Sequence, residues 1–587
     1  MMYLQRRRRT TVLRLLAAIF AILCCFLLGS FTVSVPRRVH AGPIQRTAVV
    51  GPQESSPEAQ YLAARDAKPE PAEEQIDESK PFVGHSIRDG DLFRFKTALR
   101  DVLAMLPDEM HIREILRPIE GTGNQRLREI GLRTKAYKSF FEAWEALHVV
   151  SDDNFTYVRD DVLLYLRHAE DLRDISFMSR ADIMRAYEAY RYFLVNLADL
   201  LFPWTKPYFA DHMSLHASFH HGGRGIVMSG NDEQAPFMLT GIKSIRKLGC
   251  GLPIEIMYLG EEDLGEDYRA ELEAIDGVVC RDMSQMVRDN GWKLAGWAGK
   301  PFAILNSSFR EVLFIDADAL FFRNPELLFE DPAYAKTGAL FFRDRLVSPE
   351  SKKRWLQSIL PKPISKSVRS SRLWTGDSGH QQESGVIVVD KWRHFMAMLL
   401  VTRMNGPERD SDHDKGIIGI YDMVYGDKET FWLGWELVGD LDYAFHQGDA
   451  GIMGVLQDPS EADANTLKTA LSDLNRDNGT SSLDAETPSN FTVCAPQLVH
   501  LDLKGRPFWF NGWLLNNKFN DKHKHEKAGT FEIFMAEPRD VREPGAWQIG
   551  EHNMCCLTAD AWQYFTEDER KNLDMLINVA REVGAVA

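Results

Sequence analysis

Two aspartates that are two residues apart, Asp316 and Asp318, directly follow an apolar run, 312–315. Two carboxylates at the end of a buried strand can converge on one hard cation such as Mg²⁺ or Mn²⁺, and a diphosphate would complete its ligand shell. The chain holds four other Asp-x-Asp pairs, but none of them ends an apolar strand of an α/β region. A solvated turn or a helix cap before Asn324 is the alternative interpretation. The position at a strand end favours a metal site.

The elements that must position this pair alternate between strand and helix. Apolar runs predict strands over 225–229, 253–259, 277–280 and 311–315, and stripes at helical spacing predict helices over 236–248, 267–275 and 301–309. This order is typical of an α/β fold with a parallel sheet, in which ligands bind past the carboxyl ends of the strands. Neither G-x-G-x-x-G nor G-x-x-x-x-G-K-[ST] occurs at the expected place, so dinucleotide and P-loop enzymes are not supported.

The N-terminal part of the chain has the pattern of a membrane anchor. Residues 15–35 carry no charge and are long enough to span a bilayer, and arginines cluster in front of them. We therefore expect a cytosolic tail over 1–14, a transmembrane helix over 15–35 and type II topology. A signal peptide cleaved near Ala41 is the alternative, although such apolar regions are usually shorter, at about 7–15 residues.

The rest of the chain is predicted to contain three parts. Residues 36–85 are rich in Pro, Glu, Ala and Ser, which predicts a disordered stem. Helical stripes such as Tyr137, Phe141, Trp144 and Leu147 predict a helical subdomain over 86–210. The α/β domain is then expected over 211–587.

Composition excludes several classes of protein. The formal net charge is −16, and the first 40 residues carry arginines but no acid, so the remaining chain is more acidic still. A protein with this much negative charge binds nucleic acid poorly. Seven cysteines in 587 residues are too few for a disulfide scaffold, and their pairing is not readable from the sequence.

Several longer motifs resemble a known family. The segments WAGKPFAIL (297–305), SSFREV (307–312) and FIDADA (314–319) resemble the core of the fungal Golgi alpha-1,3-mannosyltransferase family, which makes mannan and glycoprotein glycans. Shorter matches are LPIE (252–255), YLG (258–260), QESGV (382–386), GDKETFW (426–432) and HLD (500–502). The motifs are collinear and extend from about Gly222 to Asn517.

This resemblance implies a function that the residues alone do not give. It implies a GT-A-like fold, a Rossmann-like mixed sheet with flanking helices, and a GDP-mannose donor with Mn²⁺ or another divalent cation. It also implies a Golgi location, with the catalytic body lumenal, and a retaining transfer of alpha-mannose to mannose-containing glycans, with the alpha-1,3 linkage favoured. The alternatives are an alpha-1,2-mannosyltransferase of the same fold, another nucleotide sugar, or an inactive glycan-binding membrane protein. The intact Asp316–Asp318 pair argues against an inactive glycan-binding protein.

By resemblance, Asp316 and Asp318 are the family's D-x-D pair, with Asp318 on the metal and Asp316 on the metal or the ribose. Lys300 could reach the diphosphate or orient Asp316, or it could be a surface lysine at a helix start. His500 follows a short apolar stretch and is a candidate third metal ligand, since related folds take one from a C-terminal His. A lone His is more often structural.

The remaining acidic candidates are Glu383, Asp427, Glu429 and Glu436. We expect Glu383, Asp427 and Glu429 to act in catalysis, with Asp427 or Glu429 near the acceptor hydroxyl. Trp432 and Glu436 are expected to bind the acceptor, with Trp432 against a sugar face. Acids in a first helical turn are often only partners of the helix dipole, which is the alternative here. Retention requires a carboxylate nucleophile or attack on the same face as the leaving diphosphate, and the sequence does not decide between them.

Overall fold

The computed structural model describes residues 89–151, 156–206, 208–457, 491–515, 526–538, 546–550 and 554–587. These residues belong to one compact unit, Phe82–Ala587. The predicted tail 1–14, membrane anchor 15–35 and stem 36–85 lie outside the described residues. Within the described ranges, no helix is both long enough and apolar enough to cross a membrane.

The first part of the described chain is mainly helical. Its helices are α3 (Asp89–Met105), α4 (Glu109–Leu116), α5 (Gly123–His148), α6 (Val162–His168), α7 (Arg180–Leu201) and α8 (His212–Phe219), with a small hairpin of β1 (Val149–Ser151) and β2 (Thr156–Val158). The predicted stripe of Tyr137, Phe141, Trp144 and Leu147 is buried along α5. The helices that the sequence predicts in this region are therefore present.

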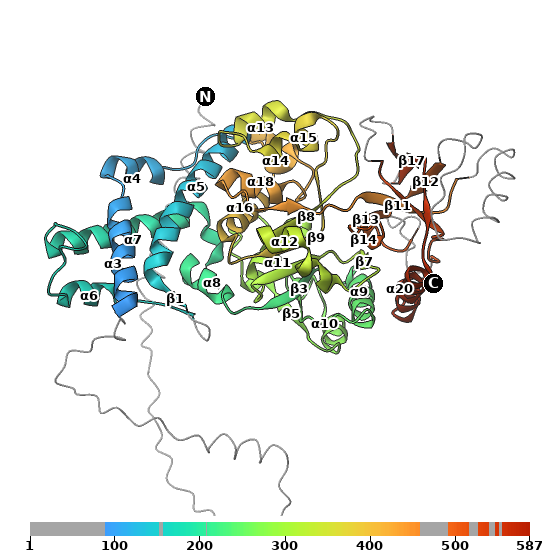
Figure 1. Cartoon of the computed structure of the whole chain (residues 1–587), viewed down its shortest axis with the longest axis horizontal. Coiled ribbons are helices and arrows are strands. Elements are labelled where there is room, and N and C mark those ends of the chain that lie inside the picture. The colour runs from blue at the N-terminus through green and yellow to red at the C-terminus, as the bar shows by residue number, and fades with distance from the viewer. Residues whose placement is uncertain are drawn as a thin grey trace, which may run out of the picture. The chain divides into compact units, whose positions relative to one another are not determined.

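A mixed seven-stranded sheet follows, with the order β10-β8-β9-β6-β3-β4-β5 (Figure 1). Its first half is the predicted α/β alternation: β3 (Arg224–Ser229), α9 (Ala235–Lys247), β4 (Ile254–Tyr258), α10 (Glu266–Glu273), β5 (Val278–Asp282), α11 (Gly299–Asn306) and β6 (Glu311–Ile315). These four strands are parallel. The parallel arrangement that the strand–helix alternation predicts is thus confirmed for these strands, whereas the later strand β9 (Gln382–Asp390) runs antiparallel to both β6 and β8 (Ala339–Arg343). The mixed sheet implied by the resemblance is present.

Short helices and a short strand complete this part of the chain. They are α12 (Pro332–Thr337), α13 (Lys353–Ile359), α14 (Lys366–Arg369), α15 (Arg372–Thr375), α16 (Phe395–Asn405), α17 (Ile420–Met423), α18 (Thr430–Val438) and β10 (Ala444–Phe445). Every residue of α16 and α18 is buried. Figure 1 shows the N-terminal helices beside α16 and α18, and α5 contacts α18 directly.

A second sheet of six strands begins immediately after the Asp pair. Its order is β18-β15-β11-β13-β14-β7. The strands are β7 (Ala319–Phe321), β11 (Ala450–Gly454), β13 (Leu498–Leu501), β14 (Pro507–Asn511), β15 (Ile533–Ala536) and β18 (Gln563–Tyr564). Because β6 ends at Ile315 and β7 starts at Ala319, only residues 316–318 separate the two sheets.

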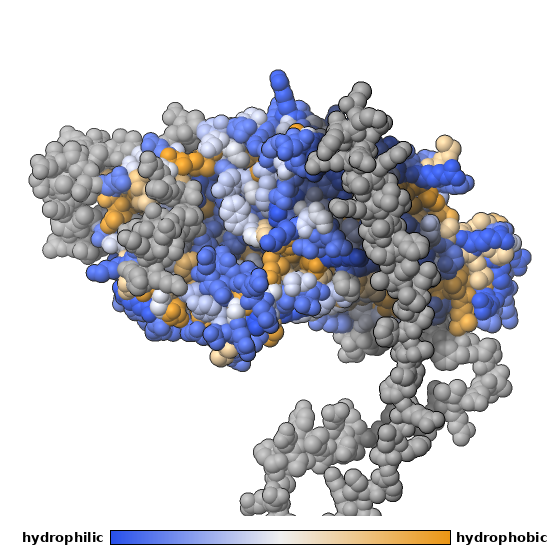
Figure 2. Space-filling view, turned by 180° about the vertical axis from the view of Figure 1, so that it is seen from behind, coloured by the Kyte–Doolittle hydropathy of each residue, from blue (hydrophilic) through white to orange (hydrophobic). Residues whose placement is uncertain are grey.

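The C-terminal part adds a small sheet and a helix. The sheet contains β12 (Phe491–Ala495), β16 (Trp547–Ile549) and β17 (Cys555–Ala559), and a disulfide joins Cys494 to Cys556 across the β12–β17 pair. The last helix, α20 (Glu567–Glu582), starts with a capping box of Thr566 and Glu569 and packs on α9. The surface in Figure 2 is mainly hydrophilic, with hydrophobic residues in several separate groups.

Candidate active site

The Asp pair occupies the turn between the two sheets. The Asp316 N–H donates to the carbonyl of Gly385 on β9 over 2.8 Å, and the Trp513 N–H donates to the carbonyl of Asp318 over 3.2 Å. The turn is thus held from both sheets. Both aspartates are only partly buried, whereas the strand before them is almost fully buried. Their carboxylates lie at the carboxyl end of β6, where the sequence predicts a site.

Lys300 joins Asp316 to a second carboxylate. Its Nζ lies 2.7 Å from Asp316 Oδ2 and 3.5 Å from Asp427 Oδ2, and it donates to Ser384 Oγ over 3.2 Å. Burial alone would lower the pKa of Lys300, but the charges of Asp316 and Asp427 outweigh it, so the net direction is upward and the amine stays charged. Burial and the nearby Asp318 raise the pKa of Asp316 to about 7 against the opposing effect of Lys300. The interpretation of Lys300 as a surface lysine is wrong, because it is only 7% exposed.

Asp427 is the third charged group of this cluster. It precedes α18 and is only 3% exposed. Its Oδ2 has no hydrogen-bond partner among the described residues, and the ammonium of Lys300 at 3.5 Å is its ion-pair partner. A buried carboxylate oxygen that accepts no hydrogen bond is unusual in a folded protein, so this atom is well suited to accept one from a ligand.

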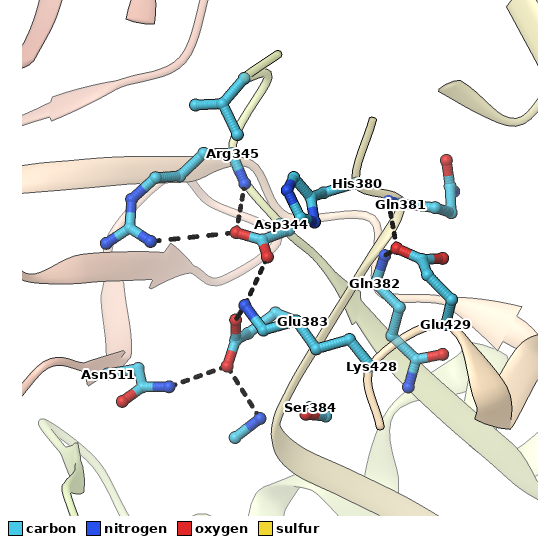
Figure 3. A network of polar contacts seen from close by, with 12 residues as sticks. Asp344, Arg345, His380, Gln381, Gln382, Glu383, Ser384, Lys428, Glu429 and Asn511 are labelled. Carbon is cyan, nitrogen blue, oxygen red and sulfur yellow. Dashed lines mark hydrogen bonds and ion pairs between the residues drawn. The ribbon is translucent and has the colours of Figure 1, made fainter. Parts of the chain in front are cut away.

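A second network, centred on Lys428, lies next to the first (Figure 3). Lys428 Nζ donates to Asp344 Oδ2 over 2.6 Å and to Glu383 Oε2 over 2.8 Å. The other oxygen of Glu383 accepts from the Gly385 N–H and from Asn511 Nδ2 over 2.9 and 2.8 Å. Burial opposes ionisation, but Lys428 outweighs it and holds the pKa of Glu383 well below its usual range. Glu383 is therefore an ionised carboxylate with both oxygens engaged.

Glycine 385 makes this packing possible. A Cβ at this position would lie 2.8 Å from Asn511 Nδ2 and 3.0 Å from Glu383 Oε1. Neither Asn511 nor Lys428 was predicted from the sequence as a site residue. Lys428 lies inside the matched GDKETFW segment, and that was its only signal, because a lysine normally indicates an exposed position.

Glu429 stabilises the loop before β9 by hydrogen bonds. It accepts hydrogen bonds from the N–H groups of Gln381 and Gln382 over 2.7 and 3.3 Å, and from the indole N–H of Trp432. Burial raises its pKa to about 7 despite these bonds. With its oxygens engaged, Glu429 supports the loop and does not point to an open substrate site, as a catalytic role would require.

The predicted acceptor residues are enclosed. Trp432 is 1% exposed, so it does not present the open ring face that sugar stacking requires. Glu436 accepts from Ser365 Oγ over 2.7 Å and from the Tyr443 hydroxyl over 2.8 Å. Trp432 and Tyr443 border a cavity of about 500 Å³, whose wall also contains Arg343, Arg372 and Glu537. An acceptor role for Trp432 is restricted to that cavity, and Glu436 is not part of the cavity wall.

His500 lies in aromatic packing on β13. Its ring stacks on Trp509 with centroids 4.0 Å apart, and burial lowers its pKa to about 3. Across the described residues, no group of three or more His, Cys, Asp and Glu side chains is arranged to hold a metal ion. His500 does not form such a group with Asp316 and Asp318 among the described residues, and its role as a third metal ligand stays a prediction.

The Asp pair itself fits a divalent cation. Carboxylate oxygens suit Mg²⁺ and Mn²⁺, and such ions are often held by one or two carboxylates together with substrate phosphates. Lys300 contacts Oδ2 of Asp316, and the side chains of both aspartates reach the surface. This arrangement is consistent with a metal site that has two carboxylate ligands and needs a phosphate as a further ligand.

Comparison with known proteins gives a family match over the residues of the candidate site. Residues 223–502 match the family described as "Mannosyltransferase putative". The match covers slightly less than half of the chain. The matched residues contain the charged side chains of both networks, from Lys300 and Asp316 to Glu383 and Lys428, which agrees with the resemblance that the motifs indicate.

The chain is also similar to curated fungal proteins. It is 30% identical over 257 residues to "Putative alpha-1,3-mannosyltransferase MNN14" of Candida albicans, covering 40% of this chain and 36% of the relative. It is 23% identical over 351 residues to alpha-1,3-mannosyltransferase MNT3 of Saccharomyces cerevisiae, covering 54% and 51%. The chain thus spans about half or less of the length of these relatives. A solved structure, the glycosyltransferase GlyE of Streptococcus pneumoniae, gives a TM-score of 0.25 at 12% identity and covers 43% of this chain and 50% of GlyE.

Proposed function

We propose that the chain is a metal-dependent GT-A mannosyltransferase that transfers alpha-mannose from GDP-mannose to mannose-containing glycans with retention. The observation that carries this proposal is the Asp316–Asp318 turn at the end of β6, with Lys300 bound to Asp316, inside the family-matched segment. The names of the relatives favour an alpha-1,3 linkage. Transfer in protein glycosylation or in cell-wall mannan synthesis agrees with their fungal origin.

In this proposal Asp316 and Asp318 would hold the Mn²⁺ ion, which would neutralise negative charge on the diphosphate leaving group. Lys300 fixes the orientation of Asp316 and supplies one positive charge next to it. Lys428 keeps Glu383 ionised at neutral pH.

Asp427 is the best-placed of the predicted catalytic carboxylates to contact a substrate hydroxyl. Its Oδ2 accepts no hydrogen bond from the described residues, whereas the oxygens of Glu383 and Glu429 are engaged. A hydroxyl that donates to Asp427 would be held within the charge field of Lys300. This arrangement is compatible with attack on the same face as the leaving diphosphate and with a carboxylate nucleophile.

We also propose that the chain is a single-pass type II protein of the Golgi membrane. The support is the sequence pattern of 1–85 alone: arginines before the uncharged segment 15–35, then a stretch poor in apolar residues. A tag before Met1 would then be digested by protease in intact vesicles, whereas a tag after Ala587 would be protected. Release of the chain after cleavage near Ala41 would contradict the anchor.

The decisive test uses the full chain with GDP-mannose, Mn²⁺ and a mannobiose acceptor, followed by linkage analysis of the product. We expect an alpha-1,3-linked trisaccharide, and loss of transfer on chelation of the metal. Asp318→Asn keeps the size of the side chain but removes its charge, so we expect turnover to fall by at least ~100-fold with an unchanged fold. An alpha-1,2 product would correct the linkage, and full turnover of Asp318→Asn in EDTA would overturn the mechanism.

A further inference from the structure

Two large aromatic side chains are exposed next to the candidate active site. Trp297 is 58% exposed and Tyr425 is 56% exposed, although each is close in sequence to a buried charged residue. Trp297 lies three residues before Lys300, and Tyr425 lies two residues before Asp427. Their ring centroids are 6.1 Å apart at an interplanar angle of 36°, so the two rings form one surface.

The backbone at Gly426 fixes this surface relative to Asp427. Gly426 has a φ of +60°, and a Cβ there would lie 3.2 Å from Cε3 of the Trp297 indole. The indole therefore packs on the main chain of the residue that joins Tyr425 to Asp427. The aromatic rings are therefore held against the backbone that leads into Asp427.

His380 continues the surface toward the second network. Its ring meets Tyr425 edge-on, with centroids 5.5 Å apart, and it lies beside Asp344 (Figure 3). Its Nδ1 is buried without a hydrogen-bond partner among the described residues. Burial lowers the pKa of His380 against the opposing charge of Asp344, while Lys428 lowers it further, so the imidazole is neutral at neutral pH. A neutral imidazole can exchange hydrogen bonds with a hydroxyl group.

The position of these rings in the sheet favours an acceptor sugar over the base of the donor. Nucleotides in such folds lie past the carboxyl ends of parallel strands, here β3, β4 and β6. His380 lies two residues before β9, which lies on the other side of β6 from β3. A sugar ring offers C–H groups to an aromatic face and hydroxyls to His380 and Asp427.

We propose that Trp297, Tyr425 and His380 form an aromatic platform that binds the acceptor saccharide by stacking against its terminal sugar ring. This proposal rests on the proposed function, and it names the part of the active site that recognises the acceptor. Trp432, the aromatic residue predicted for this task, is buried, and the platform supplies the open ring faces that it lacks.

The test measures the Michaelis constants of both substrates for Trp297→Ala and Tyr425→Ala in the full chain. We expect the KM for mannobiose to rise about tenfold, the scale of one lost aromatic contact, and the KM for GDP-mannose to change less than twofold. Trp297→Phe should recover part of the loss. Tyr192→Ala is the matched control, because Tyr192 is 69% exposed on α7 and takes no part in the site.

A rise in the KM for GDP-mannose with an unchanged KM for mannobiose would overturn the proposal in favour of base stacking. KM values for mannobiose equal to that of Tyr192→Ala would show that the platform does not bind the acceptor. Saturation-transfer NMR with mannobiose alone separates this proposal from the proposed function. If the wild-type chain binds mannobiose but transfers no mannose, loss of binding in Trp297→Ala supports the platform although the proposed function fails, and retained binding overturns it.

Discussion

At the scale of single residues, Lys428 determines the state of two buried acids. Asp344 and Glu383 are 3% and 2% exposed, and the ammonium of Lys428 lies within 2.8 Å of both. Two buried carboxylates without this cation would repel each other or take up a proton. The amine therefore supports both the fold and the charge of Glu383.

We predict that Lys428→Met destabilises the chain by about 3–5 kcal/mol, the usual cost of removing one partner from a buried ion pair. Lys428→Arg keeps the charge and should cost less. Thermal unfolding of the full chain measures both changes. Equal melting temperatures for wild type and Lys428→Met would show that the two acids do not depend on the amine.

His500 gives a prediction about pH. Burial lowers its pKa to about 3, whereas an unfolded chain has a histidine pKa of about 6.5. Below pH 6.5 the unfolded state therefore binds a proton that the folded state does not, so the stability from this group is present above pH 6.5 and is lost as pH falls toward 3. At pH 5 the loss is about 2 kcal/mol relative to pH 7.

His500→Phe keeps the stacking on Trp509 and removes the titration. We expect its melting temperature to fall less than that of the wild type between pH 7 and pH 5. Parallel curves for the two proteins would contradict the buried neutral imidazole. Other buried histidines such as His212 keep the same slope in both proteins and cancel in the comparison.

The sequence predicted the charged residues of the site better than their partners. Asp316 and Asp318 were recognisable because position relative to an apolar strand is visible in a sequence. The contacts of Lys300 with Asp427, and of Glu383 with Asn511, join residues more than 120 positions apart and arise only from the tertiary packing of the chain. Trp432 was expected to stack against a sugar face, because a helical aromatic residue carries no sign of its burial in the sequence.

At the scale of elements, β9 connects the two networks. It is buried at all nine positions, it pairs with β6 and β8, and it carries Glu383 and Gly385. The four parallel strands were predictable because short loops and helices separate them in regular order. The direction of β9 was not, since an apolar run has the same pattern in either direction.

We predict that Gly385→Ala impairs turnover at least tenfold, because its Cβ would displace Asn511 or Glu383. The control is Gly241→Ala on α9, where a Cβ would approach no atom more closely than 3.9 Å. Gly241→Ala should retain turnover and stability. Assays and melting curves of both variants test this, and normal turnover in Gly385→Ala would show that the contact at 385 does not matter for the site.

At the scale of the whole described unit, the helices and the mixed sheet share one core. A single hydrophobic cluster contains Tyr137 and Leu197 from the N-terminal helices together with Phe302 and Phe431 from α11 and α18. The boundary predicted at 210/211 is therefore not a boundary between two separate cores. Composition could not reveal this, because each part has apolar stripes of its own.

Truncation tests the shared core. A chain that begins at Asp89 keeps the whole cluster, so we expect it to fold and to retain activity. A chain that begins at residue 211 exposes the faces of α16 and α18 that α5 covers, and we expect it to aggregate. Gel filtration and activity measurements compare the two, and a soluble, active chain from residue 211 would refute the shared core.

The three-residue connection between the sheets has a consequence for the order of events on heating. Residues 316–318 are tied by hydrogen bonds to β9 on one side and to Trp513 on the other. A small loosening of either sheet therefore shifts the two carboxylates relative to each other before any strand separates. Catalysis should fail a few degrees below the temperature at which the chain unfolds, and the loss should reverse on cooling. Loss of catalytic activity would thus indicate that the packing of one of the two sheets has loosened.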